Sequence, residues 1–400
     1  MVPEPKAEAG ADPRAAPRRW LLWLVGLYMA SGFPFGLIHN LVPVWLKTHG
    51  VSLADIGLAA LLGLPWTFKA LWAPLVDRYG RAGLWIAGAM GAISAALAGL
   101  SATPMGPAAA ALLLLIAVAS ATADIAIDGH FAAALPESLY GRANGVRVAA
   151  YRAALLLTGG GAVALAGQVG WEPVFLGLAV AAAGLAVLGW SLPGSARPVA
   201  APAAWLAALK SWVARRDSLA LAAFVLLFKL GDAAMGPMVS PFWLDAGMSL
   251  SEVGLFSTGV GAAVTTAGAL LGGEICTRYG LIRGLVGLGA FQAVTNLGYA
   301  AAALAPTRPL IYAASVCESL GNGLGTAAFL AFLMRATEGE QTATRFAVLT
   351  ALAGLTRTLA GAASGVGVEQ LGYPGYFAFT FALALPAFAL LPWVRSRVSP

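Results

Sequence analysis

Two aspartates and an arginine stand inside segments that are otherwise apolar, and these side chains are the best placed in the chain to do chemistry. Asp124 and Asp128 are four residues apart, so a helix would place them on one face, one turn apart. Proline and glycine at 136–141 predict a short turn, and Arg152 lies in the apolar segment that follows. Counted along helices that flank this turn, Asp128 and Arg152 would lie about 10 to 12 Å from it and Asp124 about 16 Å.

Charges at this depth in a bilayer cost a few kcal/mol each, so they are expected to face a protein interior or a wet cavity. We expect Arg152 to be the partner of the two aspartates. One interpretation is a buried ion pair that only fixes the packing of two helices. The other is a site for substrate or protons, with Asp124 and Asp128 carrying the proton and Tyr151 beside Arg152 contacting the substrate.

A second group of polar residues stands in the other half of the sequence. Lys229 and Asp232 are three residues apart, a spacing that allows a local ion pair as readily as a substrate contact. Glu318 is the only charge in its apolar segment, near Asn322 and opposite Asn296. Desolvation favours the protonated form of such a carboxyl, so Glu318 is a third candidate for proton coupling.

Arg357 roughly matches Arg152 in position along the two halves, and a guanidinium suits carboxylates and phosphates. Two such groups, one in each half, could hold an anionic substrate between them. Lys69 is nearer a helix end, and we expect it to extend toward the membrane surface. With four bases and four acids, the predicted cavity is neutral when all are charged. Protonation of one acid would leave a net positive cavity that favours an anion, which would couple protons to substrate.

The composition requires a membrane protein. The 400 residues are 59% hydrophobic and 10% charged, with a mean hydropathy of +0.79. Apolar runs long enough to cross about 30 Å of hydrocarbon recur 12 times. We therefore predict an all-α polytopic protein with 12 transmembrane helices. The predicted runs lie near 20–45, 51–74, 83–102, 106–135, 144–168, 172–193, 218–243, 251–275, 283–304, 309–334, 343–367 and 374–394.

Basic residues fall mainly on one predicted side of the membrane. Of 24 Lys and Arg, four lie within helices, two (Lys47 and Arg308) lie in loops on one side, and 18 lie on the side of both termini. This asymmetry predicts that both termini are cytoplasmic. It also accounts for the net charge of +6, so the charge does not call for a nucleic-acid partner.

The chain contains an internal repeat. The sequence SLADIG at 52–57 returns as SLSEVG at 249–254, and DRYG at 77–80 returns as TRYG at 277–280, with offsets of 197 and 200 residues. The repeat predicts a pseudo-symmetric pair of six-helix bundles with the substrate between them. The predicted units are a tail (1–19), a first bundle (20–193), a linker (194–217), a second bundle (218–394) and a C-terminal tail (395–400).

The loop after the second predicted helix, AxxxDRxGR from Ala73, resembles motif A of the major facilitator superfamily (MFS). That resemblance implies the MFS fold. It also implies that the motif latches the two halves in the outward-open state. The alternative is that its arginines only anchor the topology. The motif residues are Asp77, Arg78, Gly80 and Arg81.

Within that superfamily the chain is most similar to the AmpG-type muropeptide permeases of the peptide, acetyl-coenzyme A and drug transporter family. The segments PWTFKALWAPLVDRYG from Pro65, DIAIDG from Asp124 and GTAAFLAFLM from Gly325 carry the resemblance, with TATRFAVLTALA from Thr342. It implies a monomeric transporter of the bacterial inner membrane that imports an anionic cell-wall fragment with protons and needs no other cofactor. The alternatives are import of a siderophore or acyl-coenzyme A, export of a drug and, more remotely, a membrane enzyme or receptor. The sequence has no metal-spaced His or Cys, nucleophile elbow or phosphate loop.

Overall fold

The computed structural model of the protein describes residues 18–79, 81–134, 140–192, 216–337 and 342–395. All the regular structure in these ranges is helical, as predicted. Most of the predicted linker, most of both predicted tails and Gly80 lie outside them. The N-terminal helices are α1 (Arg18–Gly36), η1 (Leu37–Leu41), α2 (Val42–Thr48), α3 (Leu53–Leu58), η2 (Ala59–Gly63), α4 (Leu64–Phe68), η3 (Lys69–Leu71), α5 (Ala73–Arg78), α6 (Ala82–Ala102), α7 (Pro107–Ala134), α8 (Tyr140–Leu155), η5 (Leu156–Gly161), α9 (Ala162–Val169) and α10 (Trp171–Trp190).

The second half repeats this pattern. Its helices are α12 (Arg216–Phe228), α13 (Leu230–Asp245), α14 (Leu250–Glu252), η6 (Val253–Val260), α15 (Gly261–Tyr279), α16 (Leu281–Leu304), α17 (Arg308–Ala336), α18 (Thr342–Ala389) and α19 (Leu391–Arg395).

Ten helical spans of the described ranges are long and apolar enough to cross a membrane. One of them, 348–389, has 42 residues, about 63 Å of helix, which is twice the thickness of the hydrocarbon core. It contains a break at Gly372, whose φ of 65° is a left-handed value that favours glycine. The 24-residue helix α16 is not among the ten, and its sequence includes the polar Gln292 and Asn296. Two crossings in α18 and one in α16 are consistent with the 12 predicted helices.

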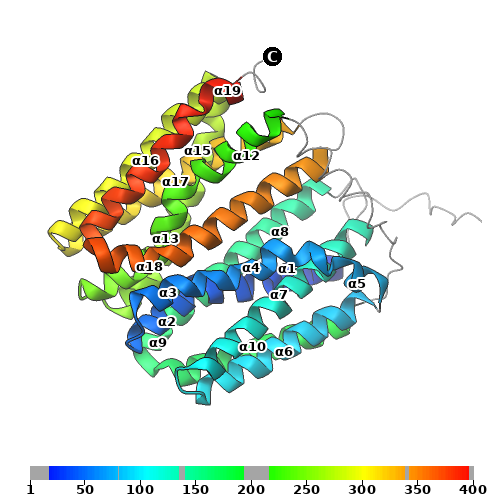
Figure 1. Ribbon diagram of the computed structural model, residues 1–400. Coiled ribbons are helices and arrows are strands. Elements are labelled where there is room, and N and C mark those ends of the chain that lie inside the picture. The colour runs from blue at the N-terminus through cyan, green and yellow to red at the C-terminus, as the bar shows by residue number, and fades with distance from the viewer. Residues whose placement is uncertain (1–17, 80, 135–139, 193–215, 338–341, 396–400) are drawn as a thin grey trace, which may run out of the picture.

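The helices pack as two groups, one from each half of the chain (Figure 1). In the first group α1 packs against α7 and α8, and α6 packs against α7 and α10. In the second, α17 packs against α15 and α16, and α18 packs against α13 and α16. Both ends of the described chain lie on one side of the bundle, which we call the terminal side, and the opposite side is the distal side.

The two groups meet at the distal ends of their helices. The repeated sequence SLADIG/SLSEVG lies at two of these contacts. Ser52 and Ser249 accept hydrogen bonds from the backbone N–H of Asp55 and Glu252 and so begin α3 and α14. The last glycine of each copy faces the other half: Gly57 packs on α18 near Gly365, and Gly254 packs on η5 near Gly160. A glycine at each position allows two backbones to approach closely.

Polar contacts also join the halves on the distal side. Lys47 Nζ lies 2.7 Å from Asp245 Oδ2, which accepts a hydrogen bond of 2.8 Å from Tyr373. The backbone N–H of Ala54 donates to Glu369 Oε1 at 2.9 Å. The distal ends of the two halves are therefore closed against each other.

Candidate functional site

Asp124 of α7 is held by residues of α1 and η3. Ser31 Oγ donates to Asp124 Oδ1 at 2.5 Å, and Lys69 Nζ lies 3.7 Å from Asp124 Oδ2. Lys69 begins the short 3₁₀ segment η3, which interrupts the second crossing and brings this side chain to α7. The expectation that Lys69 extends to the membrane surface is wrong, because its ammonium turns instead to the half-buried carboxylate of Asp124.

Asp128, one turn further along α7, has a different partner. Arg147 of α8 lies 3.5 Å from Asp128 Oδ1, and Tyr28 of α1 donates to the same oxygen at 3.4 Å. The Arg147 guanidinium also lies over the Tyr28 ring, 4.9 Å from its centroid. Asp124 and Asp128 share a face, as the spacing predicts, yet each is neutralised by its own base.

Arg152 is not the partner of either aspartate, which corrects the prediction. Its guanidinium donates to Thr266 Oγ1 of α15, in the other half, and Thr266 donates in turn to the carbonyl of Ala262 at 2.8 Å. The reason is helical geometry. Positions 147 and 151 share the face of α8 that turns toward α1 and α7, whereas position 152 is rotated by about 100° from 151. Arg152 is exposed and spans the space between the halves.

Lys229 is the centre of the polar cluster in the second half. It lies where α12 gives way to α13, with φ and ψ of −100° and 4°. Its ammonium lies 3.3 Å from Asp232 Oδ2, so the local ion pair predicted from the spacing is present. It also donates to Thr326 Oγ1 at 2.9 Å and to Asn322 Oδ1 at 3.5 Å, both on α17.

The clusters of the two halves occupy equivalent places. Ser31 and Lys229 are separated by 198 residues, and so are Asp124 and Asn322. Ser31 hydrogen-bonds to Asp124, and Lys229 hydrogen-bonds to Asn322. Each of these two contacts joins the first helix of its half to the fourth. The same helix–helix contact is therefore present in both halves with different chemistry. In the first half it contains an acid, Asp124, which pairs with Lys69, and in the second it contains a base, Lys229, which donates to acceptors on α17.

Glu318 and Asn296 have different surroundings. Glu318 is half-buried on α17, hydrogen-bonds with the neighbouring Ser319, and lies close enough to Lys229 and Asp232 to interact with both charges. Asn296 has no exposed surface, and its amide donates to Thr380 Oγ1 at 3.1 Å. The structure thus places Glu318 with the Lys229 cluster and Asn296 in the packing between α16 and α18.

Arg357 of α18 is exposed. It lies within electrostatic range of Lys229 and Asp232 in its own half and of His39 and Tyr151 in the other. Tyr151 also lies within range of Asp124. Arg357 and Tyr151 therefore lie near the Lys69–Asp124 pair and the Lys229 cluster, and we treat these residues together as the candidate site.

Aromatic side chains line the first-half wall of this site. Phe35 and His39 stack with centroids 3.9 Å apart, and Trp66 approaches them nearly at right angles at 5.6 and 5.7 Å. Tyr151 lies 6.1 Å from Phe35. Phe35, His39 and Trp66 are not among the site residues predicted from the sequence. The only signal was three aromatic rings amid apolar residues, which is also the composition of an ordinary core.

The motif A segment makes no contact between the halves that the described residues record. Arg78 is exposed and lies over the Tyr79 ring at 5.6 Å, and Arg81 is exposed where α6 begins. The side chain of Asp77 and all of Gly80 lie outside the described residues. A latch for the outward-open state would be formed only after the terminal ends close, so its role stays a prediction.

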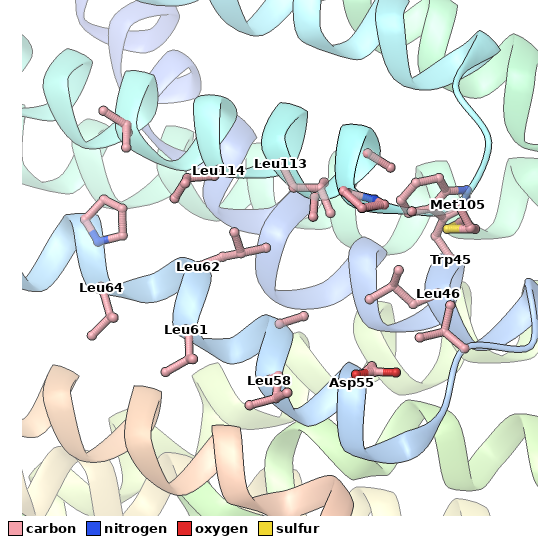
Figure 2. A pocket seen from close by; sticks show the side chains of 18 of the residues that line it. Trp45, Leu46, Asp55, Leu58, Leu61, Leu62, Leu64, Met105, Leu113 and Leu114 are labelled. Atoms are coloured by element: carbon pink, nitrogen blue, oxygen red, sulfur yellow. The ribbon is translucent and has the colours of Figure 1, made fainter.

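A separate groove of about 1140 Å³ lies on the flank of the first half, between α3–η3 and α7 (Figure 2). Its walls are mainly apolar, with several leucines, and Asp55 at one end is the one charged residue of its lining. Trp72 closes the other end by donating from Nε1 to Thr122 Oγ1 at 3.1 Å. The groove shares no lining residue with the charged clusters, so we do not include it in the site.

Known proteins place the chain in a family. A family model described as acetyl-coenzyme A transporter 1 matches residues 20–103. The anhydromuropeptide permease of Escherichia coli K12 is 30% identical over 390 residues, covering 94% of this chain and 79% of that protein. The chain belongs to the AmpG-type permease family of the MFS. A putative transporter AmpG 4 of Rickettsia conorii is 25% identical over 405 residues, covering 96% and 97% of the two chains.

A solved structure supports the fold of this permease. A bacterial homolog of the human lysosomal transporter Spinster, in an inward-facing and occupied conformation, matches with a TM-score of 0.75 at 17% identity over 98% of both chains. At that identity the likeness shows the fold alone. The relatives and the neighbour are transporters, so the permease is a multi-pass membrane transporter of the MFS type and not an enzyme.

Proposed function

We propose that the permease imports an anionic, cell-wall-derived solute such as an anhydromuropeptide across the bacterial inner membrane, driven by protons. The observation that carries the proposal is the single site between the halves. It combines the ion pairs Lys69–Asp124 and Lys229–Asp232 with the exposed bases Arg152 and Arg357. A peptide that carries both carboxylates and an ammonium group needs side chains of both signs of charge near one another, and these residues supply them.

The pair Lys69–Asp124 suggests how protons would drive the cycle. A proton on Asp124 would end the ion pair and leave the Lys69 ammonium, 3.7 Å away, without its counterion. The site would then favour an anion, and the bound anion would in turn favour the proton, because linkage is reciprocal. Glu318, beside Lys229, could play the same part in the second half, and Asp128 is bound less deeply and stays a third candidate.

The closed distal side indicates which side of the membrane the site faces in this structure. With both termini in the cytoplasm, as the distribution of basic residues predicts, the distal side is periplasmic and the structure is inward-facing. Import would then require the distal contacts to separate and the terminal ends to close, so that the site faces each side in turn. The relatives and the structural neighbour support this cycle.

Uptake by purified protein in proteoliposomes tests the proposal. Labelled anhydromuropeptide should accumulate under an inward proton gradient and not without it. Replacement of Asp124, Arg152 or Arg357 by alanine should abolish uptake while the protein still inserts and folds. Full proton-driven uptake by all three variants would refute the proposed site.

The match of the acetyl-coenzyme A transporter model to residues 20–103 makes an acyl-coenzyme A the second candidate cargo. The same two arginines could bind its phosphates. Competition in the uptake assay separates the two: an acyl-coenzyme A that is itself accumulated, while anhydromuropeptide is not, would replace the first candidate. Adding a siderophore or a drug as the competitor in the same assay tests the remaining alternative cargoes.

A further inference from the structure

The groove between α3–η3 and α7 has an acid at its distal end, and no base of the lining faces that acid (Figure 2). Asp55 is exposed where α3 begins, and its Oδ2 accepts a hydrogen bond of 2.7 Å from Ser52 Oγ. Among the residues that the structure describes, its carboxylate has no ion-pair partner. The rest of the groove is apolar, so its chemistry suits a molecule with a cationic end and an apolar body.

The second half pairs the equivalent acid. Glu252 corresponds to Asp55, with the offset of 197 residues that relates SLSEVG to SLADIG. Glu252 Oε1 accepts hydrogen bonds from Arg308 Nε at 2.9 Å and from the Tyr312 hydroxyl at 2.6 Å. Both donors stand in the first turns of α17, so the second half neutralises its acid from within the protein.

The first half has apolar residues where these two donors would stand. Helices α7 and α17 are related by an offset of 198 residues, as Asp124 and Asn322 show. Arg308 and Tyr312 therefore correspond to Ala110 and Leu114, which both line the groove. The partner that α17 supplies to its acid is thus missing from α7.

Aromatic rings fill the equivalent space in the second half. Phe256 and Tyr312 pack with ring centroids 4.2 Å apart, and Trp243 lies 6.1 and 5.7 Å from them. Their counterparts, all in the lining of the groove, are Trp45, Ala59 and Leu114. Two of the three rings are replaced by smaller side chains, which accounts for the space between α3–η3 and α7.

The groove opens on the membrane. Leu58, Leu61 and Leu114 are exposed, and they belong to spans that are apolar enough to cross a bilayer. The groove extends from Asp55 to Trp72, about 25 Å along a helix, whereas the hydrocarbon of one leaflet is about 15 Å thick. Its volume of about 1140 Å³ exceeds the roughly 300–1,000 Å³ of common small-molecule pockets. A lipid acyl chain that enters from the distal leaflet therefore fits its length, its volume and its lining.

We propose that this groove binds a phospholipid of the distal leaflet whose headgroup carries a primary ammonium group. The ammonium would donate to Asp55, as the Arg308 guanidinium donates to Glu252, and an acyl chain would occupy the space that aromatic rings fill in the second half. Asp55 would repel a headgroup that is only negative, and a trimethylammonium group has no N–H to donate. The site lies outside the charged clusters and does not depend on the identity of the cargo.

Native mass spectrometry of the purified full-length permease, titrated with lipids in detergent, tests the site. The probes are phosphatidylethanolamine, phosphatidylcholine and phosphatidylglycerol with identical acyl chains. We expect the wild type to bind phosphatidylethanolamine most tightly. Asp55→Asn keeps the size of the side chain and should weaken that lipid alone by about 3- to 10-fold, as for loss of one exposed ion pair with its hydrogen bond.

Two further variants complete the test. The matched control is Glu252→Gln at the equivalent position, where the lost carboxylate is one that Arg308 already occupies, and it should leave the affinity for phosphatidylethanolamine unchanged. Ala59→Phe places in the groove the ring that stands at this position in the second half, and it should weaken all three lipids while the midpoint of thermal unfolding is retained.

Three results would overturn the proposal. They are equal affinity of the wild type for the three lipids, a preference for phosphatidylethanolamine that survives Asp55→Asn, and unchanged lipid binding by folded Ala59→Phe. Each would mean that the groove meets only the bulk lipid around the protein. If Ala59→Phe does not fold, the comparison of Asp55→Asn with Glu252→Gln still decides.

Discussion

Gly254 offers the sharpest perturbation of the distal closure. It is the second residue of η6 (Val253–Val260), and its α-carbon faces the backbone of η5 and α9 in the other half. A Cβ added there would overlap the carbonyl oxygen of Gly160 and lie 2.7 Å from the backbone nitrogen of Ala164. Neither atom belongs to a side chain that could turn away, so Gly254→Ala requires the two helices to separate.

The cost falls only on the closed distal state, since the halves move apart when that side opens. Overpacking of this kind costs about 1–3 kcal/mol. A bias of that size changes the ratio of the two conformations by about 5- to 150-fold. Gly254→Ala should therefore shift the permease toward the state that is open on the distal side.

Distances between spin labels on the two distal loops, at Ala102 and Ala305, would report this shift in a background without the native cysteines. The control is Gly259→Ala in the same helical segment, where the added Cβ would meet its nearest neighbour at 3.8 Å, an ordinary contact. A distance distribution for Gly254→Ala that matches the wild type and the control would refute the argument from close backbone approach.

Two further predictions concern single ion pairs. Lys69→Met should lower the midpoint of thermal unfolding and abolish uptake, because it leaves the charged Asp124 without its base. Adding Asp124→Asn should restore the unfolding midpoint but not uptake. If the double variant recovers neither, the pair does not stabilise the protein. Lys47→Glu should raise the population of the distally open state by a few-fold, because Lys47 pairs with Asp245 across the halves and exposed pairs contribute up to about 1 kcal/mol. The double exchange Lys47→Glu with Asp245→Lys should restore the wild-type label distances. If it does not, packing alone holds the distal side closed.

Composition and repetition were sufficient to predict the architecture. The apolar runs predict helices because a bilayer leaves no other way to satisfy the backbone, and the repeated SLADIG and SLSEVG segments predict two related halves. The same repeat marks the distal contacts, since its serine begins a helix and its glycine lies at the crossing point. That second role was not evident before the structure, because no sequence pattern states which backbone a glycine will approach.

The charged residues were found from the sequence, but their partners were assigned only in part. The pair Lys229–Asp232 was predicted because a spacing of three on one helix fixes proximity. Arg152 was assigned to the wrong partner because pairing between helices depends on rotation about each axis, and one residue along α8 turns a side chain from its own half to the other. The contact of Lys69 with Asp124 depends on the local 3₁₀ segment η3, which the surrounding sequence does not predict.

The most direct test of proton-coupled import through this site is the movement of protons that accompanies the cargo. With no gradient imposed, addition of anhydromuropeptide outside proteoliposomes should acidify the lumen, as read by an enclosed pH-sensitive dye. Asp124→Asn should abolish that signal in vesicles that hold the same amount of folded protein. Uptake of labelled cargo with no change of lumenal pH, or an undiminished signal in Asp124→Asn, would contradict the account.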